Sequence, residues 1–161
     1  MLFQPRISSL LFYIVALLSL SSASESRVSS GAHDILVRHG LPKGLLPDSV
    51  ISYSLSTDGS FEIELQKPCY VHFTDLVYYD KKITGKLDYG AITELAGIQA
   101  KKLFVWVPVT AINIDPSDNQ IEFHVGFLSE KLPAQQFQEI PTCKSNGCAE
   151  HLPGEGFITE V

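Results

Sequence analysis

The stretch Val50–Gln66, VISYSLSTDGSFEIELQ, decides the fold class of this chain. Apolar residues occupy every second position on both sides of Asp58-Gly59, and polar residues fill the positions between them. The apolar set is Ile51, Tyr53, Leu55, Phe61, Ile63 and Leu65. Such alternation around Asp-Gly is typical of a β-hairpin, and it fixes the register because a one-residue slip would turn every apolar side chain to water. We therefore predict two antiparallel strands with one face in the core.

The same alternation recurs along most of the chain. It predicts further strands at Cys69–Thr74, Leu76–Asp80, Lys82–Tyr89, Lys101–Asp115 and Gln120–Phe127, the last with Phe127 facing the core. Pro108 indicates an edge or a bulge in its strand, and Gly90–Ile98 fits neither period clearly. A short helix is predicted at Gly31–His39 and one helical turn after Pro133. Seven or so short strands with little helix favour a single compact antiparallel β-barrel or sandwich with a short N-terminal helix.

The ends of the chain differ from this β domain. Met1–Ala23 has one charge, an apolar centre and small residues at its end, which is the order of a secretory signal peptide. The alternative is an uncleaved signal anchor, and no later stretch is apolar enough to span a membrane. We expect residues 24–30 to be a flexible leader, residues 31–140 to form the β domain, and residues 141–161 to be a polar, disordered tail.

Charge and cysteine content narrow the class of protein. The net charge of −6 makes nucleic acid an improbable partner, because phosphate backbones repel an acidic surface. The three cysteines are Cys69, Cys143 and Cys148, and in an oxidising compartment two of them can pair. Cys143 and Cys148 are the natural pair because only a four-residue turn separates them, although sequence alone leaves all three pairings open. Secretion to the extracellular space is expected, with the endoplasmic reticulum or a membrane anchor as alternatives.

No motif for catalysis or metal binding stands out. A Gly-x-Ser-x-Gly nucleophile elbow is absent from the sequence, and Cys69 shares a strand face with apolar residues, which favours a buried thiol. His72, His124 and Glu122 fall on the outer faces of strands and are more simply surface residues than a site. We therefore expect no catalytic residue, no metal and no cofactor.

Aromatic residues opposite the main core are the best functional lead. Phe104, Trp106, Tyr78 and Tyr79 could line a cavity or an apolar patch for a ligand. The simpler alternative is a second layer of core. These four residues are our predicted ligand-binding residues.

A series of motifs follows in fixed order along the chain: Gly40-Leu41-Pro42-x-Gly44-Leu45-Leu46-Pro47, Pro68-Cys69, Ile83-Thr84-Gly85-Lys86-Leu87, Tyr89-Gly90, Leu95-Ala96-Gly97-Ile98, Leu103–Val109 and Val125-Gly126-Phe127. This series resembles the plant domain-of-unknown-function family 538 (DUF538). The resemblance implies a compact β domain behind a signal peptide and a role in stress or development, without an established reaction. We expect a non-enzymatic binding module for an apolar ligand or lipid, a membrane surface or a protein partner. The alternative, also implied by the resemblance, is a hydrolase of an apolar ester of the chlorophyll type.

Overall fold

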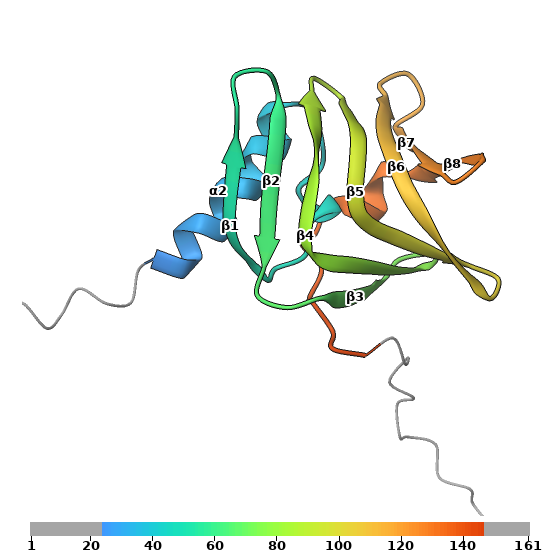
Figure 1. The fold of residues 1–161 in the computed structure, drawn as a ribbon. Helices are drawn as coiled ribbons and strands as arrows, with labels where there is room; N and C mark the ends of the chain where they lie inside the picture. The colour runs from blue at the N-terminus through green and yellow to red at the C-terminus, as the bar shows by residue number, and fades with distance from the viewer. Residues whose placement is uncertain (1–23, 147–161) are drawn as a thin grey trace, which may run out of the picture.

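The computed structural model describes residues 24–146 and shows one antiparallel sheet of eight strands preceded by a helix (Figure 1). The elements are α2 (Ser24–Arg38), η1 (Lys43–Leu45), β1 (Val50–Leu55), β2 (Ser60–Leu65), β3 (Cys69–His72), β4 (Leu76–Asp88), β5 (Ala91–Lys102), β6 (Val105–Asp115), β7 (Gln120–Val125), β8 (Leu128–Pro133) and η2 (Ala134–Phe137). The predicted mainly β fold with an N-terminal helix is confirmed. Most of Gly90–Ile98, whose sequence pattern fits neither a helix nor a strand clearly, belongs to the long strand β5.

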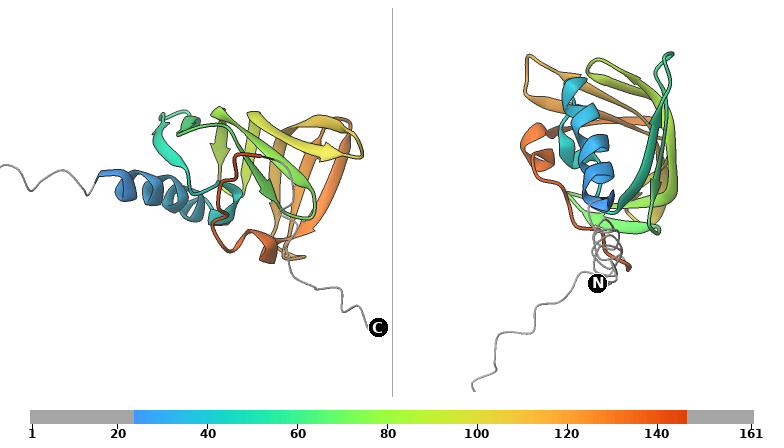
Figure 2. Two further views of the ribbon diagram at one scale, coloured as in Figure 1. Left: turned by 90° about the horizontal axis from the view of Figure 1, so that it is seen from below. Right: turned by 90° about the vertical axis from the view of Figure 1, so that its left-hand side faces the viewer.

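The strands follow the order β1-β2-β4-β5-β6-β7-β8, and β3 pairs with the first half of β4 beside β2. The sheet curls around α2, η1 and η2, which lie on its concave side (Figure 2). The two ends of the sheet, at β1 and β8, are not paired with each other, so the sheet is neither a closed barrel nor a two-layer sandwich. Side chains rather than a strand ladder must therefore close its open seam.

The predicted hairpin forms β1 and β2. Gly59 has φ of +86°, and the amide of Ser56 donates to the carbonyl of Ser60 over 2.8 Å, which closes the turn. Ile63 and Leu65 are buried as predicted. The apolar residues of β1 were expected to be buried too, but Ile51, Tyr53 and Leu55 are 38–41% exposed. They differ because β1 is the edge strand and only α2 packs against its inner face.

Bulges let the long strands bend. Gly97 has φ of +92°, and a Cβ at this position would lie 2.3 Å from the carbonyl oxygen of Lys82 on β4. Only glycine allows that close crossing. Pro108 lies in a central strand rather than at an edge, beside a register shift between Val109 and Ala111. The predicted bulge is thus the correct alternative.

The helix is longer than predicted. It begins at Ser24, so the expectation of a flexible leader at residues 24–30 is wrong. Its buried residues Ala32 and Leu36 join Leu45 and Leu46 in the core under the sheet. No helix within residues 24–146 is long and apolar enough to cross a membrane. The predicted signal peptide, residues 1–23, lies outside the described residues.

The cysteine pairing differs from the prediction. A disulfide joins Cys69 at the start of β3 to Cys143, with the two Cα atoms 5.4 Å apart and a sequence separation of 74. Cys143 therefore does not pair with Cys148, which lies outside the described residues. The segment after Pro141 is also ordered further than expected, since Lys144 forms a backbone bridge with Tyr70. Asp48 holds the same segment by accepting a 2.9 Å hydrogen bond from the Cys143 amide.

Candidate functional site

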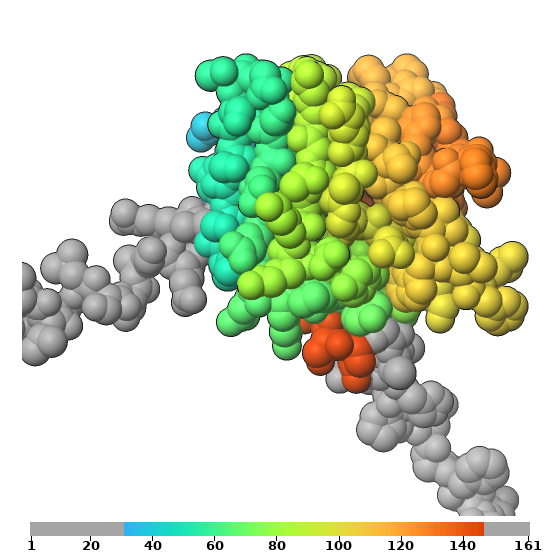
Figure 3. Space-filling view, in the orientation of Figure 1, coloured from blue at the N-terminus to red at the C-terminus, as the bar shows by residue number. Residues whose placement is uncertain are grey.

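Two neighbouring hairpin turns present large apolar side chains to solvent. Leu103 and Phe104, between β5 and β6, are 90% and 93% exposed. Phe127, between β7 and β8, is 107% exposed, and Leu128, the first residue of β8, is 69% exposed. Both turns project from the same side of the molecule, the first in yellow and the second in orange (Figure 3). We call these four residues the apolar end. Large exposed apolar side chains grouped in this way mark interaction sites in soluble proteins.

Hydrogen bonding and backbone conformation fix the two turns. Leu103 has φ of +56°, which turns the chain sharply from β5 into β6. Gly126 has φ of +59°, and its amide donates to the carbonyl of Pro108 over 3.0 Å. This bond ties the β7–β8 turn to β6. The prediction that Phe127 faces the core is wrong, because the chain leaves the strand at Gly126, before that residue.

An aromatic cluster lies directly behind the apolar end. Tyr70, Tyr78 and Trp106 pack together on the outer face of the sheet in tilted and edge-on contacts, with ring centroids 5.2–6.1 Å apart. Trp106 follows Phe104 by two residues, which is about 7 Å along a strand. The Lys101 ammonium lies 5.9 Å from the centroid of the Trp106 ring. Partial burial, with Asp80 and Tyr70 nearby, raises the pKa of Tyr78, so the phenol stays neutral.

The four predicted ligand-binding residues divide into two groups. Phe104, Trp106 and Tyr78 lie at the apolar end or in the aromatic cluster behind it. Tyr79 instead points into the core, where it is 3% exposed and its hydroxyl donates to the carbonyl of Leu45 over 3.1 Å. Neighbouring residues on a strand face opposite sides of the sheet, so Tyr78 and Tyr79 cannot share one site.

A small cavity lies on the concave side of the sheet, and Tyr79 is in its wall. Its volume is about 40 Å³. The wall is almost wholly apolar and includes Phe73, Val77, Ile98, Ala100, Phe123 and Leu132. Asp75 and Glu130 are the charged residues that line it. Ligand pockets usually measure about 300–1,000 Å³, so in this conformation the cavity is closed to all but very small molecules.

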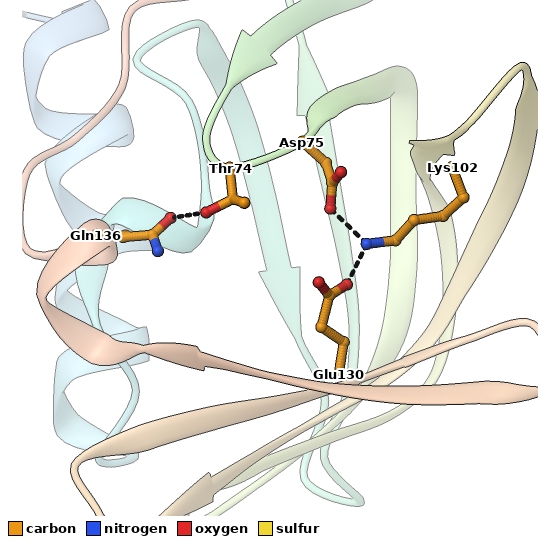
Figure 4. Close-up of polar contacts among 5 residues, drawn as sticks. All are labelled: Thr74, Asp75, Lys102, Glu130 and Gln136. Carbon is orange, nitrogen blue, oxygen red and sulfur yellow. Dashed lines mark hydrogen bonds and ion pairs between the residues drawn. The ribbon is translucent and has the colours of Figure 1, made fainter.

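Asp75 and Glu130, which line the cavity, form an ion cluster with Lys102 (Figure 4). Because these side chains are partly exposed, we call this part of the wall the mouth of the cavity. The Lys102 ammonium from the end of β5 pairs with both Asp75, in the β3–β4 turn, and Glu130, on β8. The three side chains are 26–34% exposed. Partial burial alone would lower the pKa of Lys102, but hydrogen bonds and charge attraction from the two carboxylates outweigh it and raise that pKa. Lys102 therefore stays charged and holds the cluster together.

A second contact joins the same parts of the molecule. The Thr74 hydroxyl donates to the side-chain oxygen of Gln136 in η2 over 2.9 Å. This hydrogen bond and the ion cluster together connect the β3–β4 turn to β8 and η2, and β3 and β8 are not paired with each other. Sequence reasoning missed Asp75, Lys102 and Glu130, since they are far apart in sequence and no local motif marks them.

One group of side chains bears on the hydrolase alternative, because it places a serine beside a histidine. Ser129 Oγ lies 3.2 Å from Nδ1 of His124, and Nδ2 of Asn113 lies 2.9 Å from Nε2 of the same ring. With the Asn113 amide donating to Nε2, the ring proton is on Nδ1 and points at the serine. A general base needs that nitrogen unprotonated. None of the described cavities is lined by Ser129 or His124.

The remaining candidates for chemistry are not assembled either. Cys69 is bound in the disulfide and so is not a free thiol. Within residues 24–146, no three His, Cys, Asp or Glu side chains converge in a way that could hold a metal ion. The site that this part of the chain does assemble consists of the apolar end, the aromatic cluster and the closed cavity.

Comparison with known proteins identifies the family. The model of the family described as "Protein of unknown function, DUF538" matches residues 32–138. The chain belongs to the DUF538 family. One relative, "Uncharacterized protein At5g01610" of Arabidopsis thaliana, is 28% identical over 87 residues, which are 52% of this chain and 51% of that protein. The match spans about half of the relative's length, and the DUF538 resemblance seen in the sequence is confirmed.

Proposed function

We propose that this DUF538 protein is a binding module that docks on a lipid bilayer through its apolar end. The observation that carries the proposal is the almost complete exposure of Leu103, Phe104 and Phe127, with Leu128 beside them, at the tips of two adjacent turns. Burying such side chains is worth about 1.5–3 kcal/mol each. Together they supply more than the roughly 4 kcal/mol that corresponds to millimolar binding.

The order of residues behind the tips favours a bilayer over a protein partner. Leu103 and Phe104 come first, the rings of Trp106 and the tyrosines come next, and Lys101 lies beside Trp106. A membrane interface has this same order, with acyl chains innermost, tryptophan and tyrosine at the headgroups, and lysine at the phosphates. Two separate tips also suit insertion better than the broad, continuous patch of about 800 Å² per partner that a stable protein interface needs.

The compartment is part of the proposal. The leader Met1–Ala23 supports entry into the secretory pathway and an extracellular location. A disulfide between Cys69 and Cys143 agrees with an oxidising compartment.

Vesicle co-sedimentation tests the docking. The full-length chain is expressed in plant cells, and the protein is purified. Mass spectrometry determines its N-terminal residue, and the protein is then mixed with phosphatidylcholine vesicles. We expect Phe104→Ser and Phe127→Ser each to weaken binding at least tenfold. Tyr89→Ser is the matched control, because Tyr89 is 82% exposed in the β4–β5 turn at the opposite end of the sheet. Equal binding by all three variants, or no binding by the unaltered protein, would rule out docking through these tips.

Ester hydrolysis is the second candidate, and the Ser129–His124–Asn113 arrangement is the observation in its favour. An Asn113 amide that donates to Nε2 leaves the ring proton on the side of the serine, and none of the described cavities is lined by Ser129 or His124. We therefore expect Ser129→Ala to leave any hydrolysis of a p-nitrophenyl acyl ester unchanged. A loss of activity of a hundredfold or more in this variant would instead establish the hydrolase.

A further inference from the structure

The mouth of the cavity lies at the same end of the sheet as the apolar end. Lys102 directly precedes Leu103, and Glu130 follows Leu128 by two residues. Asp75 lies in the β3–β4 turn, beside the end of β5. A bilayer that covers the two tips would therefore face the ion cluster and the cavity behind it.

The cavity has the lining of a lipid-chain site in a closed state. Every strand from β4 to β8 contributes apolar side chains to its wall, and the charged side chains that line it are the two carboxylates bound to Lys102. At about 40 Å³ it holds a few water molecules at most. Apolar cavities of this kind stay dry and bind apolar molecules instead.

The seam beside the mouth can open without breaking the sheet. β3 and β8 are not paired with each other. Side chains join the β3–β4 turn to β8 and η2 here, through Lys102 with its two carboxylates, the Thr74–Gln136 hydrogen bond and the contact between the Phe73 and Phe137 rings. Separating the β3–β4 turn from β8 and η2 would enlarge the cavity while every described strand ladder stays intact.

We propose that this cavity takes up a single straight acyl chain from a membrane lipid, and that the Asp75–Lys102–Glu130 cluster is the latch over its mouth. The source of the chain rests on the proposed function, because docking of the apolar end brings the mouth to the bilayer. The binding site itself is a property of the cavity and is tested without vesicles.

The test measures uptake of cis-parinaric acid, a fluorescent unbranched fatty acid, in solution. Ala100 lies in the cavity wall, so Ala100→Leu fills the space and is expected to lower the affinity at least tenfold. Ala96→Leu is the matched control, since Ala96 is exposed on the same strand. Lys102→Met removes the latch and is expected to speed uptake at least fivefold.

The outcomes separate this site from the docking surface. Uptake that Ala100→Leu abolishes and Ala96→Leu leaves intact supports the cavity, and Ala100→Leu should still sediment with phosphatidylcholine vesicles. Uptake without vesicle binding would keep the cavity site and overturn the bilayer as its source. Uptake that is the same in Ala100→Leu overturns the cavity as the site. If Ala100→Leu does not fold, the comparison of Lys102→Met with the unaltered protein tests the proposal. The proposal is overturned if neither of these two proteins takes up the fatty acid.

Discussion

Tyr78 and Tyr79 are adjacent in the chain, but the sheet gives them opposite surroundings. Tyr78 belongs to the outer aromatic cluster, whereas Tyr79 is enclosed between the sheet and η1 and bonds to the Leu45 carbonyl. Complete burial strongly raises the pKa of the Tyr79 phenol. The ring therefore fastens η1 to the sheet and is part of the structure rather than of an exposed site.

Replacing Tyr79 by Phe should lower stability in a way that depends on pH. Loss of the hydroxyl leaves the buried Leu45 carbonyl without this partner, and we expect about 1–3 kcal/mol less free energy of unfolding at neutral pH. A raised pKa in the folded state gives stability that is complete below the unfolded value near 10 and is lost as the pH rises above it. Urea unfolding at pH 7 and at about pH 11 should show a smaller alkaline loss for Tyr79→Phe than for the unaltered protein.

Tyr78→Phe is the control, because its phenol is only partly buried. We expect its alkaline loss of stability to remain close to that of the unaltered protein. The same alkaline loss in Tyr79→Phe would contradict the assignment of Tyr79 as a buried structural phenol.

At the scale of elements, the disulfide connects the start of β3 to the segment after η2. In the chain-entropy view, a loop of this length contributes about 4 kcal/mol by restricting the unfolded chain. We expect Cys143→Ser to lower the free energy of unfolding by about 2–4 kcal/mol and to free the segment around Lys144 for proteolysis. Cys148→Ser should change neither, and peptide mapping should recover Cys69 linked to Cys143. A linked Cys143–Cys148 peptide would show that the local pairing predicted from the sequence is correct after all.

Features that depend on a few adjacent residues could be predicted from the sequence, whereas features that depend on distant residues could not. The Asp58-Gly59 hairpin, the helical turn after Pro133 and the bulge at Pro108 are predictable because each depends on a few adjacent residues. The Cys69–Cys143 pair is not, since it depends on where a distant segment returns. At the site, Phe104, Trp106 and Tyr78 were found from their aromatic character, whereas the ion cluster joins three separate elements. Phe127 was misplaced because alternation does not show where Gly126 ends the strand.

At the scale of the whole molecule, the apolar end belongs to a protein with a negative net charge, and we call the rest of the molecule the acidic body. The chain carries a net charge of −6, while Lys101 is the exposed charged residue nearest in sequence to the tip of the β5–β6 turn. Docking should therefore depend on apolar burial at the tips, and the charge of the body should oppose a negatively charged membrane. This differs from the common polybasic mode of membrane binding, which anionic lipid strengthens.

Salt dependence separates the two modes. We expect weaker sedimentation with vesicles of phosphatidylcholine and phosphatidylglycerol than with phosphatidylcholine alone at about 0.05 M salt. Raising the salt to about 0.5 M shortens the screening length and should remove most of that difference, because it weakens the repulsion between the acidic body and the anionic surface. Binding to phosphatidylcholine should hardly change, since burial of Leu103, Phe104 and Phe127 does not depend on charge. If binding to the anionic vesicles is instead the stronger and salt abolishes that preference, attraction between Lys101 with its neighbours and the lipid headgroups drives the binding. In that case Lys101→Ala should weaken binding more than Phe104→Ser does.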